Sequence, residues 1–213
     1  MGKYYAVLKG KNPGIYTSWD DCKKQVIGFK DARYKGFENE EDAKTFMENS
    51  SNEYLNDMTE ENIETYAFVD GSFNQKTNTY GYGGFIIHKK DVEGEDGIVT
   101  KETVKTLLQG SSNDSEMALM RNVAGEITGS MEAIKEAIKL GYKSLVLFYD
   151  YAGIEMWATG QWNRTKQGTQ DYYDFIQKAK EKINISFVKV KGHTGIEGNE
   201  EVDKLAKEAC GIE

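Results

Sequence analysis

Short apolar segments separated by turns fill the first fifty residues of the chain. Their alternation predicts three strands, over Tyr4–Lys9, Ile15–Thr17 and Arg33–Phe37. Ser18 followed by two aspartates predicts the start of a helix that runs to about Gln25. A second helix is expected over Glu40–Met47. Together these elements form a β-β-α-β-α module of about fifty residues, near the lower size limit for independent folding, with Phe29 in its small core.

The next segment, Glu48–Asn62 (ENSSNEYLNDMTEEN), is polar and acidic and has no periodic apolar positions. Such a composition favours a flexible connection over a packed element. We therefore expect three parts in the chain. They are a module over residues 1–49, a flexible acidic linker over residues 50–62 and a larger domain over residues 63–213.

Longer elements follow the linker. Strands are predicted over Thr65–Phe73, Tyr80–His88 and Ile98–Leu108. A long helix is expected from about Glu116 to Leu140, because apolar residues recur on one face and Gly141 can end it. The unbroken apolar run SLVLFYD, residues 144–150, is typical of a central strand buried on both faces.

Helices and strands then alternate to the end of the chain. We expect helices over Tyr151–Ala158 and Asp171–Lys182, a strand over Ile185–Lys191, and a helix that begins near Gly198 and Asn199. Three strands followed by alternating helices and strands predict an α/β fold. Its centre should be a mixed five-stranded sheet flanked by helices.

Composition narrows the class of protein. The chain has 213 residues, 38% hydrophobic and 29% charged, and no apolar run of membrane-spanning length or apolar leader at its start. Cys22 and Cys210 lie far apart, which supports neither a disulfide framework nor a zinc site. We expect a monomer in the reducing cytoplasm, or at the nucleoid, with no membrane partner and no small-molecule cofactor.

The net charge of −8 argues against a nucleic-acid partner, but its distribution argues for one. Residues 1–37 carry eight Lys or Arg against three Asp, a net charge of +5. A local basic patch matters more than the total, since salt screens charges beyond about 10 Å. Exposed aromatic residues between these cations would suit stacking and phosphate neutralisation.

Two aspartates occupy positions that should be apolar. Asp70 follows Ala67–Val69 in a predicted central strand, and Asp150 ends the SLVLFY run. An unpaired charge is costly there, which indicates a functional group or a dedicated partner. The alternative is that each residue caps a turn.

Four further residues stand near apolar stripes or in a loop. Glu126 borders the apolar face of the long helix, and Glu200 and Asp203 share one side of the terminal helix. His193 lies in a loop bracketed by Gly192 and Gly195. The alternatives are a solvated Glu126, a surface histidine, and surface pairs of Glu200 with Lys204 and of Asp203 with Lys207.

The predicted topology brings four acids to one edge of the sheet: Asp70, Glu126, Asp150 and Asp203. Four carboxylates cannot share a small site fully ionised unless cations neutralise them. Oxygen ligands without clustered Cys or His favour Mg²⁺, with Mn²⁺ as a substitute. Two such ions bridged by carboxylates are the usual device for displacement at a phosphodiester.

The chain resembles type 1 ribonuclease H with an N-terminal hybrid-binding domain. The resemblance rests on YAFVDGS, NVAGEITGSMEAI, VLFYD and KGHTGIEGNEEVDKLAKEA, in that order, and on KYYAVLKGKNPGIYTSWDDCKKQV with ARYKGF in the first module. It implies the ribonuclease H fold and endonucleolytic hydrolysis of the RNA strand of RNA–DNA hybrids. It also implies two Mg²⁺ ions and products with 3′-hydroxyl and 5′-phosphate ends.

The resemblance also assigns roles to individual residues. The metal-binding acids would be Asp70, Glu126, Asp150 and Asp203, with His193 in proton handling or product release and Glu200 in metal exchange. Asn122 would read the minor groove, and the backbone at Gly71 and Ser72 would meet RNA 2′-hydroxyls. The hybrid would also contact the first module, at Trp19, Arg33, Tyr34 and Lys35.

The chain departs from the family pattern at several positions. Tyr151 follows the third acid, where Ser or Thr is frequent, and Val123 follows Asn122, where a second asparagine is frequent. Gly36 replaces a second lysine after Lys35. The basic loop is shortened to ATGQWNRTKQGTQ, and we expect its Trp162 and the preceding Trp157 to pack. The shorter loop should make the first module more important for binding.

Two other functions compete with a hybrid-specific ribonuclease. One is a hybrid- or duplex-RNA-binding protein whose nuclease domain has decayed, which the intact acids at all four positions disfavour. The other is a transposase or junction resolvase of the same superfamily. Those proteins lack this first module and the GH…NE..D ending.

Overall fold

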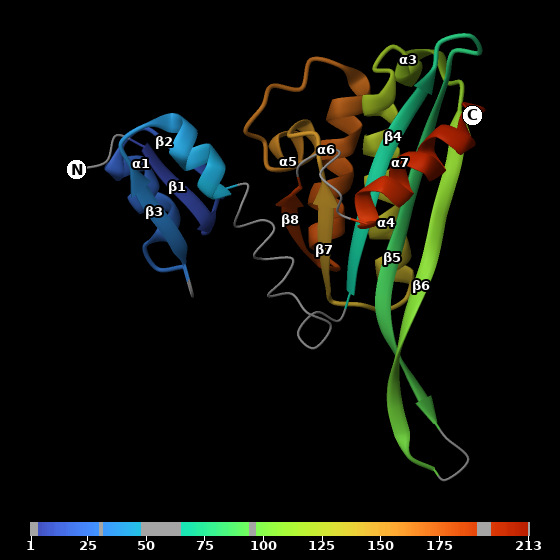
Figure 1. Cartoon of the computed structure of the whole chain (residues 1–213), viewed down its shortest axis with the longest axis horizontal. Coiled ribbons are helices and arrows are strands. Elements are labelled where there is room, and N and C mark those ends of the chain that lie inside the picture. Colours follow the sequence, from blue (N-terminus) through green and yellow to red (C-terminus); the bar gives the residue numbers. More distant parts are fainter. Residues whose placement is uncertain (1–3, 30–31, 48–64, 94–96, 191–196, 213) are drawn as a thin grey trace. The chain divides into compact units, whose positions relative to one another are not determined.

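The computed structural model describes residues 4–29, 32–47, 65–93, 97–190 and 197–212 of the chain. The chain divides into two compact units, residues 1–62 and residues 63–213, called here the smaller and the larger unit. Both are drawn in Figure 1. Each unit is described by itself.

The smaller unit contains an antiparallel three-stranded sheet in the order β2-β1-β3. Its strands are β1 (Tyr4–Lys9), β2 (Gly14–Tyr16) and β3 (Arg33–Phe37). Helix α1 (Trp19–Val26) starts as predicted, because the Ser18 side chain accepts a hydrogen bond of 3.1 Å from the Asp21 amide. Residues 40–47 form a further helix. The predicted β-β-α-β-α order is confirmed.

The core of the smaller unit differs from the prediction at Phe29. One buried cluster consists of Val7, Cys22 and Val26, against which Tyr5 and Tyr16 pack, and Ala6 and Ala43 are also fully buried. Phe29 is 36% exposed, so its assignment to the core is wrong. Helix α1 ends at Val26 and the chain turns at Gly28 (φ 75°), which carries Phe29 away from the sheet.

The larger unit is built on a mixed five-stranded sheet in the order β6-β5-β4-β7-β8 (Figure 1). Strands β4, β5 and β6 are antiparallel neighbours, whereas β4, β7 and β8 run parallel. The bounds are β4 (Thr65–Asn74), β5 (Thr79–Glu93), β6 (Val99–Ser112), β7 (Ser144–Tyr149) and β8 (Asn184–Lys189). The predicted mixed sheet is therefore confirmed.

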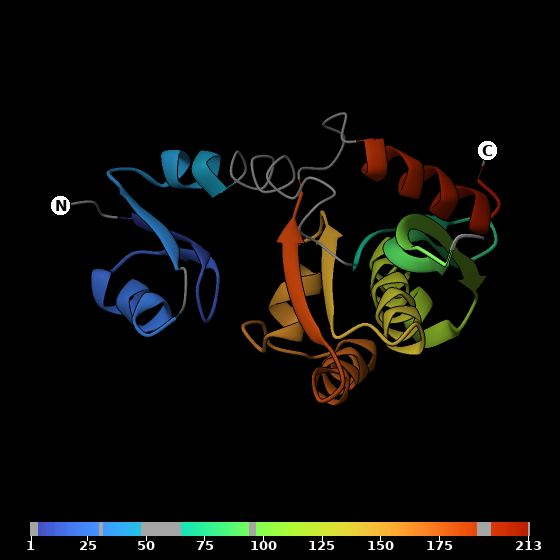
Figure 2. The same ribbon diagram turned by 90° about the horizontal axis from the view of Figure 1, so that it is seen from below.

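Helices cover both faces of this sheet. They are α3 (Ser115–Ala118), α4 (Asn122–Lys139), α5 (Gly153–Ala158), α6 (Gln167–Lys180) and α7 (Glu197–Ala209). Figure 2 shows α7 on one side of the sheet and α4 on the other. The main core lies on the α4 side, where Ile127, Ile134, Leu147, Tyr172 and Ile176 are fully buried.

The predicted long helix from Glu116 to Leu140 is wrong as a single element. The chain leaves helical geometry between α3 and α4, and Arg121 has φ 55° and ψ −131°, in a region that non-glycine residues rarely occupy. Its C-terminal end agrees with the prediction, since Gly141 takes a φ of 86°. Strand β5 continues to Glu93, beyond the predicted end at His88, because β6 pairs with its whole length.

None of the helices in the described part of the chain is long and apolar enough to cross a membrane.

Candidate active site

The two central parallel strands place two aspartates side by side. The register of β4 and β7 pairs Phe68 with Phe148, and these rings stack with centroids 4.6 Å apart. Side chains two residues apart along a strand share a face, so Asp70 and Asp150 each follow this pair on the same side. The β4–β7 ladder ends at the stacked pair. The two carboxylates therefore lie where the strands separate, at the carboxyl end of the sheet.

Helix α4 brings a third carboxylate to this edge because glycines allow an unusually close approach. A Cβ atom at Gly71 of β4 would lie 2.2 Å from the Asn122 carbonyl oxygen, and one at Gly125 would lie 2.0 Å from the Gly81 carbonyl oxygen. Only glycine tolerates such contacts between backbones. Glu126, the residue after Gly125, is thereby only 4% exposed.

These elements gather three of the predicted acids. One carboxylate oxygen from each of Asp70, Glu126 and Asp150 lies within 4.8 Å of the others. Asp203, on α7, lies near enough for its charge to act on Asp70. The start of α7 packs on the face of the sheet that carries Phe68 and Asp70, since a Cβ atom at Gly198 would lie 3.2 Å from the Phe68 ring.

Burial and mutual repulsion make this cluster hard to ionise. Burial, the charge of Asp150 and, more weakly, that of Asp203 raise the pKa of Asp70 to about 7, although the Gly71 amide donates a 2.7 Å hydrogen bond to it. Burial and the charges of Asp150 and Asp70 raise the pKa of Glu126 to about 9. A bound cation would offset both shifts, because its charge stabilises the ionised carboxylates.

The donor set fits a hard divalent cation. Asn122 donates a 3.3 Å hydrogen bond to Glu126 Oε1, whereas the buried Oε2 atom has no hydrogen-bond partner within the described ranges. A buried carboxylate oxygen left without a donor is costly, and a metal ion would satisfy it. The gathered ligands are all carboxylate oxygens, which Mg²⁺, Mn²⁺ and Ca²⁺ prefer over softer donors.

Asp203 already has a cationic neighbour in the chain. Lys207 Nζ lies 2.7 Å from Asp203 Oδ2, so the surface pair of Asp203 with Lys207 exists. The Lys207 ammonium also acts to lower the pKa of Asp70, against the larger effects that raise it. Glu200 is exposed, and Lys204 lies 3.8 Å from Glu208. A metal ion at Asp203 would therefore compete with Lys207.

The remaining predicted residues of the larger unit have different surroundings. Gly71 and Ser72 are half-buried on β4, and the Gly71 amide is engaged by Asp70. Asn122, the first residue of α4, is exposed next to the acid cluster. His193 lies outside the described residues.

In the smaller unit three aromatic rings gather on one face of the sheet, whereas Lys35 Nζ lies 5.5 Å from the Phe37 and Phe46 ring centroids. The Trp19 ring lies between Tyr5 and Tyr34, with centroids 5.5 and 5.6 Å away, and Trp19 and Tyr34 are 36% and 46% exposed. Arg33 and Lys35 are exposed on the same strand, but alternation turns them to the opposite face from Tyr34. Because β3 is an edge strand, both faces are accessible from its free side.

Sequence reasoning missed one buried polar pair beneath the site. The Tyr149 hydroxyl donates a hydrogen bond to Glu155, which is 8% exposed and whose pKa burial raises. This pair ties the end of β7, directly before Asp150, to α5. The available signal was a single acid in the segment GIEMWA.

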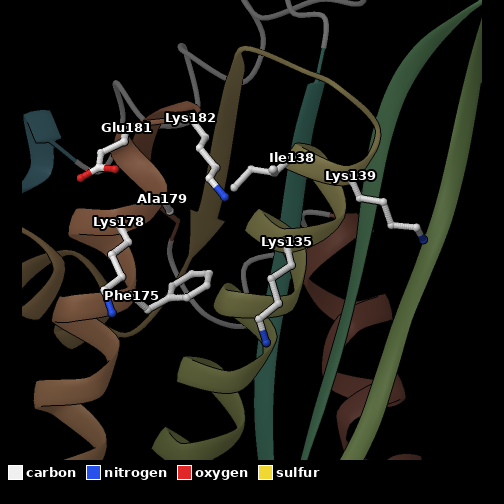
Figure 3. A pocket seen from close by; sticks show the side chains of 8 residues that line it. All are labelled: Lys135, Ile138, Lys139, Phe175, Lys178, Ala179, Glu181 and Lys182. Atoms are coloured by element: carbon white, nitrogen blue, oxygen red, sulfur yellow. The ribbon is translucent and has the colours of Figure 1, made fainter.

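A groove of about 460 Å³ between α4 and α6 lies away from the acids (Figure 3). Lys139, on its rim, is 13 residues from Glu126, about 20 Å along the helix axis. Two of its lysines, Lys135 and Lys139, already pair with Glu132 and Glu136 of their own helix. The groove is therefore not part of the acid site.

The close approach of Gly125 to the Gly81 carbonyl oxygen predicts that a larger residue at position 125 destabilises the protein. Gly125→Ala should lower the free energy of unfolding by about 3 kcal/mol, because the added Cβ atom must push α4 away from the Gly81 carbonyl oxygen. Displacing α4 would also move Glu126 and slow catalysis. Chemical denaturation and a nuclease assay would measure both effects.

Gly129→Ala, one turn further along α4, is the matched control. Its Cβ atom would first meet Tyr82 Cβ at 3.2 Å, and alanine favours the helix by about 1 kcal/mol. Gly129→Ala should therefore lower the free energy of unfolding much less than Gly125→Ala does. Equal effects of the two substitutions would contradict the close approach at Gly125.

Similar proteins agree with this geometry. The sequence profile described as Ribonuclease H1 N-terminal domain matches residues 3–47. Mouse Ribonuclease H1 is 26% identical, in an alignment that covers 99% of this chain and 90% of the mouse protein. Ribonuclease H of Saccharomyces cerevisiae is 49% identical over 47 residues, which are 22% of this chain and 14% of the yeast protein.

The crystal structure of LC9-RNase H1, described as a type 1 RNase H with the type 2 active-site motif, has the same fold. It superimposes with a TM-score of 0.51 and 18% identity, covering 69% of this chain and 72% of that one. A mixed five-stranded sheet with carboxylates at the ends of its central parallel strands thus gives this chain the ribonuclease H fold, with a donor set that fits a divalent cation. The RNase H profile matches residues 62–211, and the chain belongs to the RNase H family. It is accordingly a hybrid-specific ribonuclease.

Proposed function

We propose that this protein cuts the RNA strand of RNA–DNA hybrids internally, using two divalent cations, Mg²⁺ in the cell, and leaving 3′-hydroxyl and 5′-phosphate ends. The observation that carries the proposal is the approach of three carboxylates to within 4.8 Å, one with a buried oxygen that lacks a donor. Both cysteines are buried and free, which suits the reducing cytoplasm.

In this proposal the four acids would hold the cations, and bound cations would supply activation of a water molecule and stabilisation of the leaving oxygen. Asp70 and Asp150 are fixed by the strands, and Glu126 by the contact between α4 and the sheet. Asp203 supplies the fourth carboxylate once Lys207 releases it. His193 and Glu200 would assist proton handling and metal exchange from the edge of the site.

The proposed RNA contacts lie next to the acids. Asn122 is exposed at the start of α4, with its amide nitrogen toward Glu126, and its carboxamide would read the minor groove. The Gly71 amide is occupied, so the contact to a 2′-hydroxyl would come from the Gly71 carbonyl oxygen or from Ser72.

An assay of end-labelled substrates tests the function. The full chain would be incubated with RNA–DNA hybrid, duplex RNA and duplex DNA, with Mg²⁺ or with EDTA. We expect internal cuts in the RNA strand of the hybrid only, and only with Mg²⁺. Cleavage that persists in EDTA, or intact hybrid under all conditions, would overturn the proposal.

We further propose that residues 1–49 form a hybrid-binding module joined to the catalytic domain (63–213) by a linker over 50–62. Trp19 and Tyr34 would stack on the duplex, while Arg33 and Lys35 would neutralise phosphates. A tethered module raises the local concentration of substrate at the catalytic site.

Deleting residues 1–49 should weaken hybrid binding by about tenfold or more and flatten its salt dependence, because phosphate contacts release counterions. Turnover at saturating hybrid should remain. Fluorescence anisotropy at several salt concentrations would measure the first effect, and initial rates the second.

Single substitutions test which residues of the module bind the hybrid. Lys35→Ala should lower the salt slope by about one, as expected for one lost phosphate contact. Lys24→Ala is the matched control, since Lys24 pairs with Asp21 at 2.7 Å. An unchanged affinity after the deletion would show that the module has another role.

A further inference from the structure

Tyr151 holds a hydroxyl group in a fixed place beside the acid cluster. It directly follows Asp150, and its ring packs against Trp157 and Trp162, with centroids 5.8 and 6.3 Å away. Gly153 makes room for this ring, since a Cβ atom there would lie 2.3 Å from Tyr151 Cε1. The side chain is half-buried, so little rotational freedom remains for binding to remove.

The Tyr151 phenol adjoins the acid cluster, because Tyr151 directly follows Asp150, one of the three gathered acids. Burial and, more weakly, the charge of Glu126 raise the pKa of Tyr151, in keeping with a position near the acids. Among the described residues of the larger unit, the Tyr151 hydroxyl has no hydrogen-bond partner. A hydroxyl on a half-buried, packed side chain is therefore available to a ligand.

The neighbouring groups restrict what that ligand can be. Carboxylates offer only acceptors, and the Asn122 amide already donates to Glu126. The Tyr151 phenol is a neutral group that both donates and accepts, as a ribose 2′-hydroxyl also does. Anionic phosphate oxygens are matched instead by cations held on the acids.

We infer that the Tyr151 hydroxyl hydrogen-bonds a 2′-hydroxyl of the RNA strand next to the cleaved phosphodiester and so contributes to the preference for RNA over DNA. This inference rests on the proposed function. Tyr151 thereby adds a side-chain contact to the substrate contacts proposed for Asn122, Gly71 and Ser72.

A double-mutant cycle between protein and substrate tests the contact. Tyr151→Phe removes one oxygen and keeps the ring packing, so the variant should retain its thermal midpoint. The substrates are an end-labelled all-ribose hybrid and a series in which one ribonucleotide at a time is replaced by its 2′-deoxy form. The rate of cutting at each phosphate is measured for both proteins.

On the all-ribose hybrid Tyr151→Phe should reduce kcat/KM about tenfold, as expected for one lost hydrogen bond. On the substrate that lacks the contacted 2′-hydroxyl, the two proteins should cut that phosphate at nearly equal rates. Tyr173→Phe is the matched control, because it also removes one phenol oxygen. Tyr173 lies on α6, where the Arg164 guanidinium covers its ring. Tyr173→Phe should leave the rates and the cycle unchanged.

Two results would overturn the inference: equal rates for Tyr151→Phe and the natural chain on the all-ribose hybrid, or a loss of rate that is the same at every 2′-deoxy position. Both leave hybrid cleavage by the natural chain intact. A natural chain that leaves the hybrid uncut would instead overturn the proposed function, and this inference with it.

Discussion

Replacing Asp150 by Asn should reduce cleavage of the RNA strand by about a thousandfold or more, while affinity for the hybrid stays nearly unchanged. The amide keeps the shape of the side chain but removes one of the three charges that converge within 4.8 Å. Loss of that charge weakens the hold on a divalent cation. The effect should therefore appear in turnover, which single-turnover cleavage with Mg²⁺ would measure.

Asp174→Asn is the matched control for this substitution. Asp174 is exposed on α6, away from the end of β7, and the substitution removes the same charge from the protein. Its activity should equal that of the natural chain. Full activity of Asp150→Asn would remove Asp150 from the metal site.

Without divalent cations, the larger unit should lose stability as the pH rises from about 5 to 9. Asp70 and Glu126 have ordinary pKa values of 3.8 and 4.5, raised in the folded protein to about 7 and about 9. Between these values the folded state binds more protons than the unfolded state. The stabilisation is therefore complete below the unfolded pKa values and disappears as the pH passes the folded ones.

The change should amount to several kcal/mol, since one pKa unit corresponds to about 1.4 kcal/mol. Calorimetry in EDTA across this pH range would measure it as a falling thermal midpoint. Adding Mg²⁺ at pH 8–9 should restore the midpoint, because the ion binds the ionised carboxylates of the folded state only.

Glu126→Gln is the control for the pH experiment. The amide has nearly the same shape and cannot titrate, so it removes the larger of the two raised pKa values. Its midpoint should vary much less with pH and respond less to Mg²⁺. A variant that follows the same pH curve as the natural chain would contradict the raised pKa values.

Much of the sheet and part of the site could be predicted from local sequence. The run SLVLFYD indicated a central strand, and aspartate at the ends of two apolar runs indicated a functional edge. Those signals are local, because an aspartate in a buried strand is costly wherever the strand lies. The register that sets Asp70 beside Asp150 follows from the pairing of Phe68 with Phe148.

Other features depend on contacts between distant segments. The sequence around Glu126 does not indicate whether this acid is buried or solvated, because its burial depends on Gly71 and Gly81 from other elements. The break at Arg121 interrupts a sequence with good helical periodicity. Phe29 leaves the core through the turn at Gly28, although apolar character alone favoured burial.

The position of bound metal tests the central claim most directly. Crystals of the full chain grown with Mn²⁺ would be measured near the manganese absorption edge, and an anomalous difference map would locate the ions. We predict two peaks among the carboxylates of Asp70, Glu126, Asp150 and Asp203. A map with no peak there, although Mn²⁺ binds in solution, would contradict the account.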